Sequence, residues 1–237
     1  MAVGALPRPA EKAAAVRAMF DRIAPRYDRL NAVLTFGLDR GWRRAAVVAA
    51  ALRPRDVVVD LACGTGDLAA LAAEAGARPI GVDFAPRMLA GARARGVPAA
   101  WLRADAGALP LRAASADAVT CGFALRNFAA IPPVLAEAAR VLRPGGRLVL
   151  LEVAEPAHPL LRWGHRLYFR RLVPLVGALL ADREAYAYLP RSVAYLPPGA
   201  ALAAMIEAAG FGDVRVRRLG LGAVQLLSAC RRPEGTG

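Results

Sequence analysis

From residue 56 onward, short apolar runs alternate with segments in which apolar residues recur every three or four positions. The first pattern is typical of buried parallel strands, and the second of amphipathic helices that cover them. The alternation therefore predicts an α/β fold, with helices on both faces of a mostly parallel sheet. The expected strands are 56–61, 79–83, 98–103, 116–122 and 147–153, and the expected helices between them are 66–75, 86–95, 105–110 and 131–142.

The segments on either side of this region follow other patterns. The apolar spacing before residue 56 predicts a helix over Glu11–Ile23 and two further helices that break near Gly37. LRPGG at 142–146 predicts a helix stop and a turn. Beyond Pro156 we expect a helical, arginine-bearing insertion, followed by a helix at 199–209 and a closing hairpin of strands 213–219 and 223–230.

No linker divides the chain, so we expect a single domain over residues 1–237. Its expected parts are an N-terminal helical lid (1–52), a cofactor-binding core (56–153), a helical insertion or cap (158–198), and the closing helix and hairpin (199–230).

The stretch VVVDLACGTGD, Val57 to Asp67, predicts a strand that runs through a glycine turn into a helix. Gly64 and Gly66 leave the backbone bare where a nucleotide-like ligand approaches. The spacing up to Ala69 also fits the loose dinucleotide pattern G-x-G-x-x-A. However, Asp67 stands in the first turn of the helix, where a pyrophosphate would otherwise bind, and its charge repels phosphate. A cofactor without phosphates fits better.

Acidic residues follow the first three expected strands, and in a parallel sheet these strand ends meet at one edge. Asp60 suits an ammonium group or the amides of the loop, and Asp83 suits ribose hydroxyls. Asp105 suits the exocyclic amine of adenine, while the backbone N–H of Ala106 suits the ring. Together these residues favour S-adenosylmethionine, which carries an adenosine, an amino-acid tail and a positively charged sulfonium.

The segment CGFALRNF, Cys121 to Phe128, follows the fourth strand, where a transferase meets its acceptor. It lacks the (D/N)PPY-like sequence typical of enzymes that methylate the amino groups of bases. Instead, Arg126 and Asn127 follow an apolar stretch. An arginine at this place stabilises a phenolate oxygen and an asparagine orients it, and a phenolate is what methyl transfer to a ring carbon requires.

Several segments of the chain are similar to those of one known family. They are MFDRIAPRYDRLNAVLTFGLDRGWRR, VVDLACGTGDL, DFAPRMLAGAR, ADAGALP, GFALRNF, ARVLRPGGRLVLLEVAEP and ADREAYAYLPRSV. In these segments the chain resembles the ubiquinone/menaquinone biosynthesis C-methyltransferase family. The resemblance implies a class I S-adenosylmethionine-dependent methyltransferase fold with a seven-stranded sheet. It also implies methylation of a ring carbon of a prenylated hydroquinone, as from demethylmenaquinol to menaquinol. By the same resemblance, Thr65 joins Asp83, Asp105 and Ala106 around the cofactor, and Tyr27 joins Arg126 and Asn127 at the quinol.

Two departures leave the acceptor open. Gly122, at a cofactor-contacting position, stands where the family usually has serine, and the last strand reads AVQLLSACRR without the usual histidine-containing segment. One alternative is therefore a methyltransferase of a soluble aromatic or polyketide molecule in secondary metabolism. A second is a non-catalytic S-adenosylmethionine-binding or RNA-associated protein, for which the net charge of +13 is the only support.

Arginine carries almost all of the positive charge, and Lys12 is the only lysine. This reflects either a bias in composition or attraction to an anionic surface, and we expect no specific nucleic-acid partner. The longest apolar run, 172–181, is about half the length of a membrane span. We expect a cytoplasmic protein with peripheral contact at the inner face of the cell membrane. The residues expected to make that contact are Trp163, Tyr168, Phe169, Arg162, Arg166, Arg170 and Arg171.

Three widely separated cysteines indicate reduced thiols, and neither they nor the two histidines have metal-ligand spacing. We therefore expect no metal site. The sequence leaves open whether the chain forms a homodimer.

Overall fold

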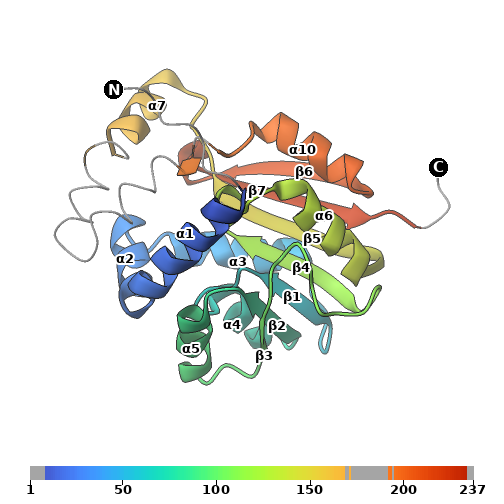
Figure 1. Cartoon of the computed structure of the whole chain (residues 1–237). Coiled ribbons are helices and arrows are strands. Elements are labelled where there is room, and N and C mark those ends of the chain that lie inside the picture. The colour runs from blue at the N-terminus through green and yellow to red at the C-terminus, as the bar shows by residue number, and fades with distance from the viewer. Residues whose placement is uncertain (1–8, 169–170, 172–191, 194, 234–237) are drawn as a thin grey trace.

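The computed structural model describes residues 9–168, 171, 192–193 and 195–233. They form a seven-stranded sheet in the order β3-β2-β1-β4-β5-β7-β6 (Figure 1). Strands β1 to β5 run parallel, whereas β7 is antiparallel to both β5 and β6. The mostly parallel sheet and the closing hairpin are thus confirmed. The strands are β1 (Val57–Leu61), β2 (Arg78–Asp83), β3 (Ala100–Arg103), β4 (Ala116–Gly122), β5 (Leu142–Val153), β6 (Phe211–Leu219) and β7 (Val224–Arg231).

Helices cover both faces of the sheet, as the alternating pattern predicted. In Figure 1, α6 and α10 lie in front of the sheet, and α3 and α4 lie behind it. The described helices are α1 (Pro9–Ile23), α2 (Tyr27–Leu34), α3 (Asp39–Ala50), α4 (Asp67–Glu74), α5 (Pro86–Ala94), α6 (Ile131–Val141), α7 (Pro159–Leu167) and α10 (Gly199–Ala208). Short 3-10 turns add η1 (Ala24–Arg26), η2 (Leu125–Asn127) and η4 (Gly220–Gly222).

Neighbouring residues of the central strands pack on opposite faces. Val58 joins the apolar cluster under α3 and α4, whereas Val59 joins the cluster under α6 and α10. Leu148 and Val149 of β5 divide in the same way. Each fully buried side chain of this size contributes about 1.5–3 kcal/mol, so the sheet is held firmly from both sides. The loops at its carboxyl edge are thereby fixed in place.

Two local expectations were wrong. Residues 105–110 form no helix but a turn closed by an isolated bridge between Asp105 and Ala108. The Asp105 carboxylate accepts the N–H of Gly107 at 2.7 Å, a side-chain turn that competes with helix formation. The turn expected at 142–146 belongs instead to β5, where the register with β4 shifts between Ala116 and Ala118. The extra residues form a bulge.

The first two helices, α1 and α2, lie at the carboxyl edge of the sheet. Met19 and Ile23 of α1 pack with Leu30 of α2 and with Met88 of α5. No helix among the described residues is long and apolar enough to cross a membrane. Within the same residues, no group of histidine, cysteine, aspartate and glutamate is arranged to hold a metal ion. Phe169 and Arg170 of the insertion lie outside the described residues.

Candidate functional site

The turn between β1 and α4 needs its glycines. Gly64 and Gly66 have φ angles of +56° and +85°, in the left-handed region that favours glycine. A Cβ atom on Gly66 would also lie 2.5 Å from Cη2 of Trp101. The N–H of Gly64 donates to Oδ2 of Asp83 at 2.8 Å. The turn is therefore fixed against the end of the neighbouring strand.

Asp83 ends β2 and organises this edge. Its second oxygen, Oδ1, accepts the N–H of Ala85 at 2.8 Å, so both carboxylate oxygens hold backbone. The residue is 6% exposed, and burial raises the pKa of its carboxyl while the bonds from Ala85 and Gly64 lower it. A carboxylate has about four acceptor positions, so Asp83 can still accept a hydrogen bond from a hydroxyl donor.

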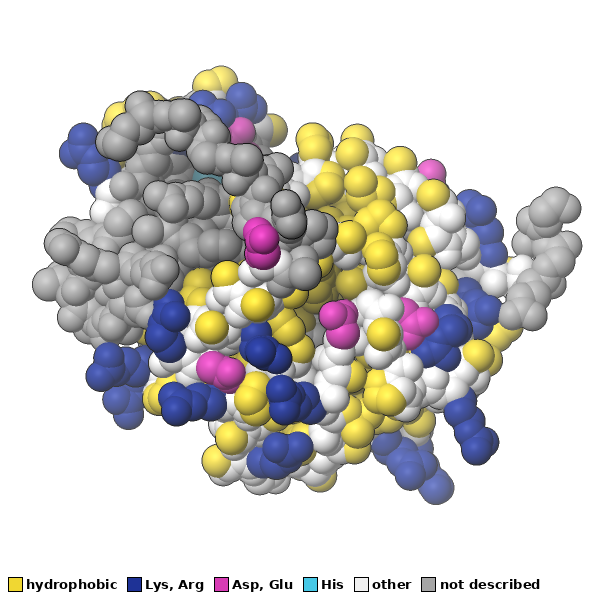
Figure 2. Space-filling view, viewed as in Figure 1, with side chains coloured by type: hydrophobic (Ala, Val, Ile, Leu, Met, Phe, Trp, Pro, Cys, Tyr) yellow, Lys and Arg dark blue, Asp and Glu magenta, His cyan; other side chains and the backbone are white. Residues whose placement is uncertain are grey.

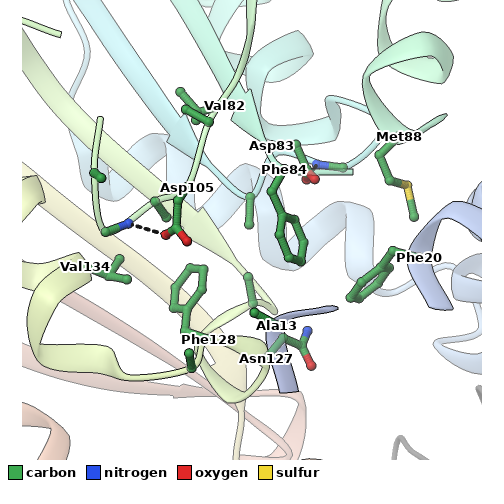
Figure 3. Close-up of a pocket in the computed structure, with 18 of the residues that line it drawn as sticks. Ala13, Phe20, Val82, Asp83, Phe84, Met88, Asp105, Asn127, Phe128 and Val134 are labelled. Carbon is green, nitrogen blue, oxygen red and sulfur yellow. Dashed lines mark hydrogen bonds between the residues drawn. The ribbon is translucent and has the colours of Figure 1, made fainter. Parts of the chain in front are cut away.

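A cavity of about 340 Å³ opens beside Asp83. Its size falls in the range of small-molecule sites, about 300–1,000 Å³. Figure 3 shows the rings of Phe20, Phe84 and Phe128 turned into it, with Asp83 and Asp105 on its rim. The described residues that line it include Ala13, Phe20, Tyr27, Gly64, Asp83, Phe84, Met88, Asp105, Ala106, Gly122, Phe123, Asn127, Phe128 and Val134. The cavity thus has a polar side and a broad apolar wall.

Asp105 and Ala106 lie on the polar side, as the sequence predicted for neighbouring strand ends. Oδ1 of Asp105 accepts the N–H of Gly107, which leaves Oδ2 without a hydrogen-bond partner among the described residues. Ala106 is nearly buried and lines the cavity. These two residues and Asp83 are therefore brought together.

Asp60 lies deeper, in a recess of about 20 Å³ that it shares with Thr65 and Tyr27. Thr120, its partner on β4, donates to Oδ1 at 2.9 Å, but Oδ2 is buried and has no partner among the described residues. Burial raises the pKa of Asp60 to about 7, against the opposing effects of Thr120 and Arg43.

The Thr65 hydroxyl donates to Oδ1 of Asp28 at 2.5 Å, so this hydroxyl is already bonded to a residue of α2.

Asp67 is the first residue of α4, as expected, but its charge is balanced by arginines. Arg95 contacts one of its carboxylate oxygens at 2.6 Å and Arg43 the other at 3.3 Å. The ion pairs weaken the argument that Asp67 would repel a phosphate. The assignment of the cofactor therefore depends on Asp83, Asp105 and the cavity.

The residues expected at the acceptor are divided by the structure. Tyr27 and Asn127 line the cavity, and the Asn127 amide donates to the Phe123 carbonyl at a long 3.5 Å. Arg126 is not among the lining residues; its guanidinium forms a buried ion pair with Glu152 of β5. Its Nε atom is buried and has no partner among the described residues.

Two charged residues of this region were missed by the sequence reasoning. Glu152 is 0% exposed and also accepts the N–H of Val153 at 2.9 Å. Lys12 of α1 is 8% exposed and bonds to the main chain after η2. Glu152 lies within the segment ARVLRPGGRLVLLEVAEP, but its spacing gave no sign of a charge pair, and the one signal for Lys12 was that it is the only lysine of the chain.

Gly122, at the end of β4, lines both the cavity and the recess. A Cβ atom there would lie 2.9 Å from Cδ1 of Leu68. The Leu68 side chain, which is buried, thus takes the space that a larger residue at position 122 would need.

The sequence and the structure of this chain are both similar to those of known proteins. A demethylmenaquinone methyltransferase of Roseiflexus castenholzii is 45% identical over 98% of this chain and 100% of its own length. The protein of the same name from Thermus thermophilus is 48% identical over 86% of this chain and 96% of its own length. Among solved structures, a SAM-dependent methyltransferase of Thermotoga maritima superposes with a TM-score of 0.65 at 22% identity, over 92% of this chain and 100% of that one.

The structural likeness confirms the class I methyltransferase fold that the sequence resemblance implied. Residues 9–231, nearly the whole chain, match the ubiE/COQ5 methyltransferase family. The chain belongs to the ubiE/COQ5 methyltransferase family.

Proposed function

We propose that this protein is an S-adenosylmethionine-dependent C-methyltransferase that converts demethylmenaquinol to menaquinol. The names of the relatives from Roseiflexus and Thermus support this reaction, and they are matched over nearly their full length. The observation that carries the proposal is a cavity in which strand-end carboxylates face aromatic side chains. Such a cavity accommodates a charged, hydroxyl-bearing cofactor beside an apolar ring.

The residues on the polar side fit S-adenosylmethionine. Asp83 would hold the ribose hydroxyls with the lone pairs that its backbone bonds leave free. Asp105 would accept from the adenine amine through its unpartnered Oδ2, beside the N–H of Ala106. Asp60 would face the ammonium of the amino-acid tail, which gives a partner to its buried Oδ2. We place Gly64, Thr65, Gly66 and Gly122 around the same ligand.

A phosphoethanolamine N-methyltransferase of Haemonchus contortus, solved with S-adenosyl-L-methionine, has the same fold with a TM-score of 0.57 at 14% identity, over 79% of this chain and 52% of that one. When bound, S-adenosylmethionine supplies an electrophilic methyl group.

The protein's part is to present the acceptor ring and to help one phenol oxygen lose its proton, because the phenolate makes the neighbouring carbon nucleophilic. Phe20, Phe84 and Phe128 would hold the ring, with Tyr27 and Asn127 orienting its oxygens. Glu152 holds the guanidinium of Arg126, which is not among the residues that line the cavity. We therefore propose that this cation stabilises the phenolate oxygen through a bridging water molecule.

Methyl transfer from labelled S-adenosylmethionine tests the proposal. Two acceptors are compared, a short-chain demethylmenaquinol under reducing conditions and a soluble phenol without a prenyl chain. We expect label on a ring carbon of the quinol, identified by mass spectrometry. Label on the phenol alone would favour a soluble aromatic acceptor. Label on neither acceptor would overturn the proposed methyl transfer to either of them.

We further propose that the chain reaches a membrane-dissolved quinol by docking on an anionic bilayer. Leu160, Trp163 and Leu167 of α7 are exposed, and Figure 2 shows apolar and arginine atoms side by side over this helix, at the upper left. Phe36, at the corner between α2 and α3, is 74% exposed and has a φ of +52°, which is unfavourable for a phenylalanine. Its ring lies 6.4 Å from that of Tyr168, which follows α7.

Charge at this corner is suited to anionic headgroups. Arg26, Arg29 and Arg40 lie close to Phe36 in the sequence, and their side chains are exposed. By contrast, Arg166 and Arg162 of α7 both contact Glu155, so they are less available than the sequence suggested. The contact we propose therefore combines the α2–α3 corner with the apolar side chains of α7.

Co-sedimentation with vesicles of phosphatidylglycerol and phosphatidylcholine tests this contact. We expect Phe36→Ser with Trp163→Ser to weaken binding by about tenfold, because two exposed aromatic anchors are lost. Val48→Ser, which removes an exposed apolar side chain from α3, is the matched control. Unchanged binding of the double variant would exclude these residues as the membrane contact.

A further inference from the structure

The one lysine of the chain is buried where three distant segments meet. Lys12 lies on α1, and its Nζ donates to the main-chain carbonyls of Arg126 at 3.1 Å and Phe128 at 2.7 Å. The ammonium also lies 4.3 Å from the ring centroid of Tyr195. Three segments that are more than 60 residues apart in the sequence therefore converge on one charged group.

This placement is costly for the folded chain. Lys12 contacts no carboxylate among the described residues, and burial lowers the pKa of its ammonium. A buried cation without a counter-charge destabilises a protein unless its donors are satisfied by other groups. Here carbonyl oxygens at the end of a 3-10 turn and an aromatic face satisfy them. An apolar residue would avoid the cost of burying the charge but would leave the carbonyls of Arg126 and Phe128 without this donor, so the specific contribution of the lysine is to bind these two carbonyls.

The two bonded segments meet at the cavity, and both contribute to its wall. Ala13, the residue next to Lys12, and Phe20 contribute the α1 side. Asn127 and Phe128, which lie within the stretch that Lys12 holds, contribute the η2 side. Figure 3 shows Ala13 beside Asn127, with the ring of Phe128 on one side of the space and that of Phe20 on the other. The bonds of a single ammonium group thus hold α1 against the Arg126–Phe128 segment where the two meet at the cavity.

We propose that Lys12 is a positioning residue for the acceptor. It clamps α1 onto the Arg126–Phe128 backbone and thereby fixes Asn127 and Phe128 where the acceptor ring binds. It acts through Asn127 and Phe128 and takes no part in proton or methyl transfer. The cofactor side, held by Asp83 and the glycine turn, does not depend on it. The inference rests on the proposed function only for the choice of acceptor.

Steady-state kinetics of Lys12→Met, Lys12→Arg and Arg17→Met test the proposal. Arg17 is an exposed cation on the same helix and serves as the matched control. We expect Lys12→Met to raise the KM for the quinol by about tenfold, as for loss of a charged hydrogen bond. The KM for S-adenosylmethionine should stay within about twofold, and Lys12→Arg should recover part of the loss. Equal changes in both KM values, or a lowered Tm with neither KM changed, would overturn the proposal.

A second measurement needs no turnover. Acetylation of the single ε-amine by an N-hydroxysuccinimide ester is followed by peptide mass spectrometry, which separates it from the N-terminal amine. The double variant Lys12→Arg/Arg17→Lys moves the only lysine to the exposed position and gives the unprotected rate. We expect wild-type Lys12 to react at least about tenfold more slowly than this variant.

A demethylmenaquinol analogue should slow acetylation of wild-type Lys12 further, whereas S-adenosylhomocysteine should leave the rate unchanged. Acetylation as fast as in the double variant would overturn the clamp. If wild-type protein methylates no quinol yet protects Lys12 from acetylation, the proposed function fails and the clamp stands. If a quinol is methylated but its analogue does not protect Lys12, the clamp fails and the proposed function stands.

Discussion

The two ends of the cavity are built by contacts of different range. At the cofactor end, Asp83 accepts the N–H of Ala85, two residues away, and that of Gly64, 19 residues away. At the acceptor end, Lys12 reaches the carbonyl of Phe128, 116 residues away, and Arg126, which follows β4, forms a buried ion pair with Glu152 of the neighbouring strand β5. The first end is made by strand-end loops that lie side by side in any sheet of this order, whereas the second depends on the docking of α1 and on buried charges.

This difference indicates how the two ends can change. A cofactor end formed by adjacent turns is retained as long as the sheet forms. The acceptor end is fixed by a few charged groups in apolar surroundings, so single substitutions should alter it without disturbing cofactor binding. Substitutions at each end can test that contrast, beginning with the largest expected effect.

Removing the carboxylate of Glu152 should cause the largest loss. In Glu152→Ala the guanidinium of Arg126 stays buried without its counter-charge, and the free energy of unfolding should fall by about 3–5 kcal/mol. Urea unfolding followed by tryptophan fluorescence measures the change. Replacing both partners, as in Glu152→Met/Arg126→Met, should restore much of the stability, because no buried charge remains.

The exposed pair of Glu155 and Arg166 provides the control for this substitution. Glu155→Ala should change the free energy of unfolding by less than about 1 kcal/mol, since water screens exposed charges. If Glu152→Ala unfolds at the wild-type urea concentration, the acceptor end is not held by this pair. The contrast between the two ends would then lose one of its two supports.

Substitution of Asp83 should act on the cofactor end alone. Asp83→Ala removes the acceptor for Gly64 and Ala85 together with the proposed contact to the ribose, and we expect S-adenosylhomocysteine to bind about a hundredfold more weakly. Isothermal titration calorimetry measures the affinity. Asp56→Ala, at the opposite end of β1, should leave affinity unchanged. An Asp83→Ala variant with wild-type affinity would remove this residue from the cofactor site.

The residues of the cofactor end were easier to predict from the sequence than those of the acceptor end, for a physical reason. Alternating apolar patterns and a glycine turn are local signals, and parallel strands bring their ends to one edge, so the sequence was enough to place Asp83 and Asp105 together. The side-chain turn at Asp105 was missed because its hydrogen bond to Gly107 competes with a helical pattern.

The acceptor end was harder to foresee, because its contacts depend on tertiary packing. The sequence predicted that the segment after β4 meets the acceptor, and Asn127 of this segment lines the cavity. The bonds of Lys12 and the pairing of Arg126 with Glu152 leave no trace in local spacing. Likewise, the sequence showed the acid at position 67 but not the arginines that balance its charge.

Asp60 should make cofactor affinity depend on pH. Because its folded pKa is about 7, the carboxyl is protonated in much of the ligand-free protein below that pH and must lose the proton to pair with an ammonium. Affinity for S-adenosylhomocysteine should therefore rise by about tenfold between pH 5 and pH 8. Asp60→Asn should flatten this dependence. A dependence that persists unchanged in the variant would assign it to another group.

The same raised pKa determines whether the free energy of unfolding rises or falls with pH. Between pH 3.8 and about 7 the folded carboxyl of Asp60 retains a proton that the unfolded chain releases, so its contribution to the free energy of unfolding falls as pH rises across this window. Urea unfolding of wild type and Asp60→Asn at pH 5 and pH 8 checks the sign. The variant should lose less stability than wild type over this interval.

The smallest effect is expected at Gly122, where the two ends meet. In Gly122→Ser the new Cβ would lie 2.9 Å from Cδ1 of Leu68, so the leucine must shift and the free energy of unfolding should fall by about 1 kcal/mol. Leu68→Val shortens that side chain, and the double variant should be less destabilised than the sum of the single ones. Because only a side-chain tip has to move, cofactor affinity should change by less than about threefold. Calorimetry measures the cofactor affinity of the three variants, and urea unfolding measures their stability. A loss of more than about tenfold in affinity would show that the bare backbone at Gly122 is itself needed for the cofactor to approach.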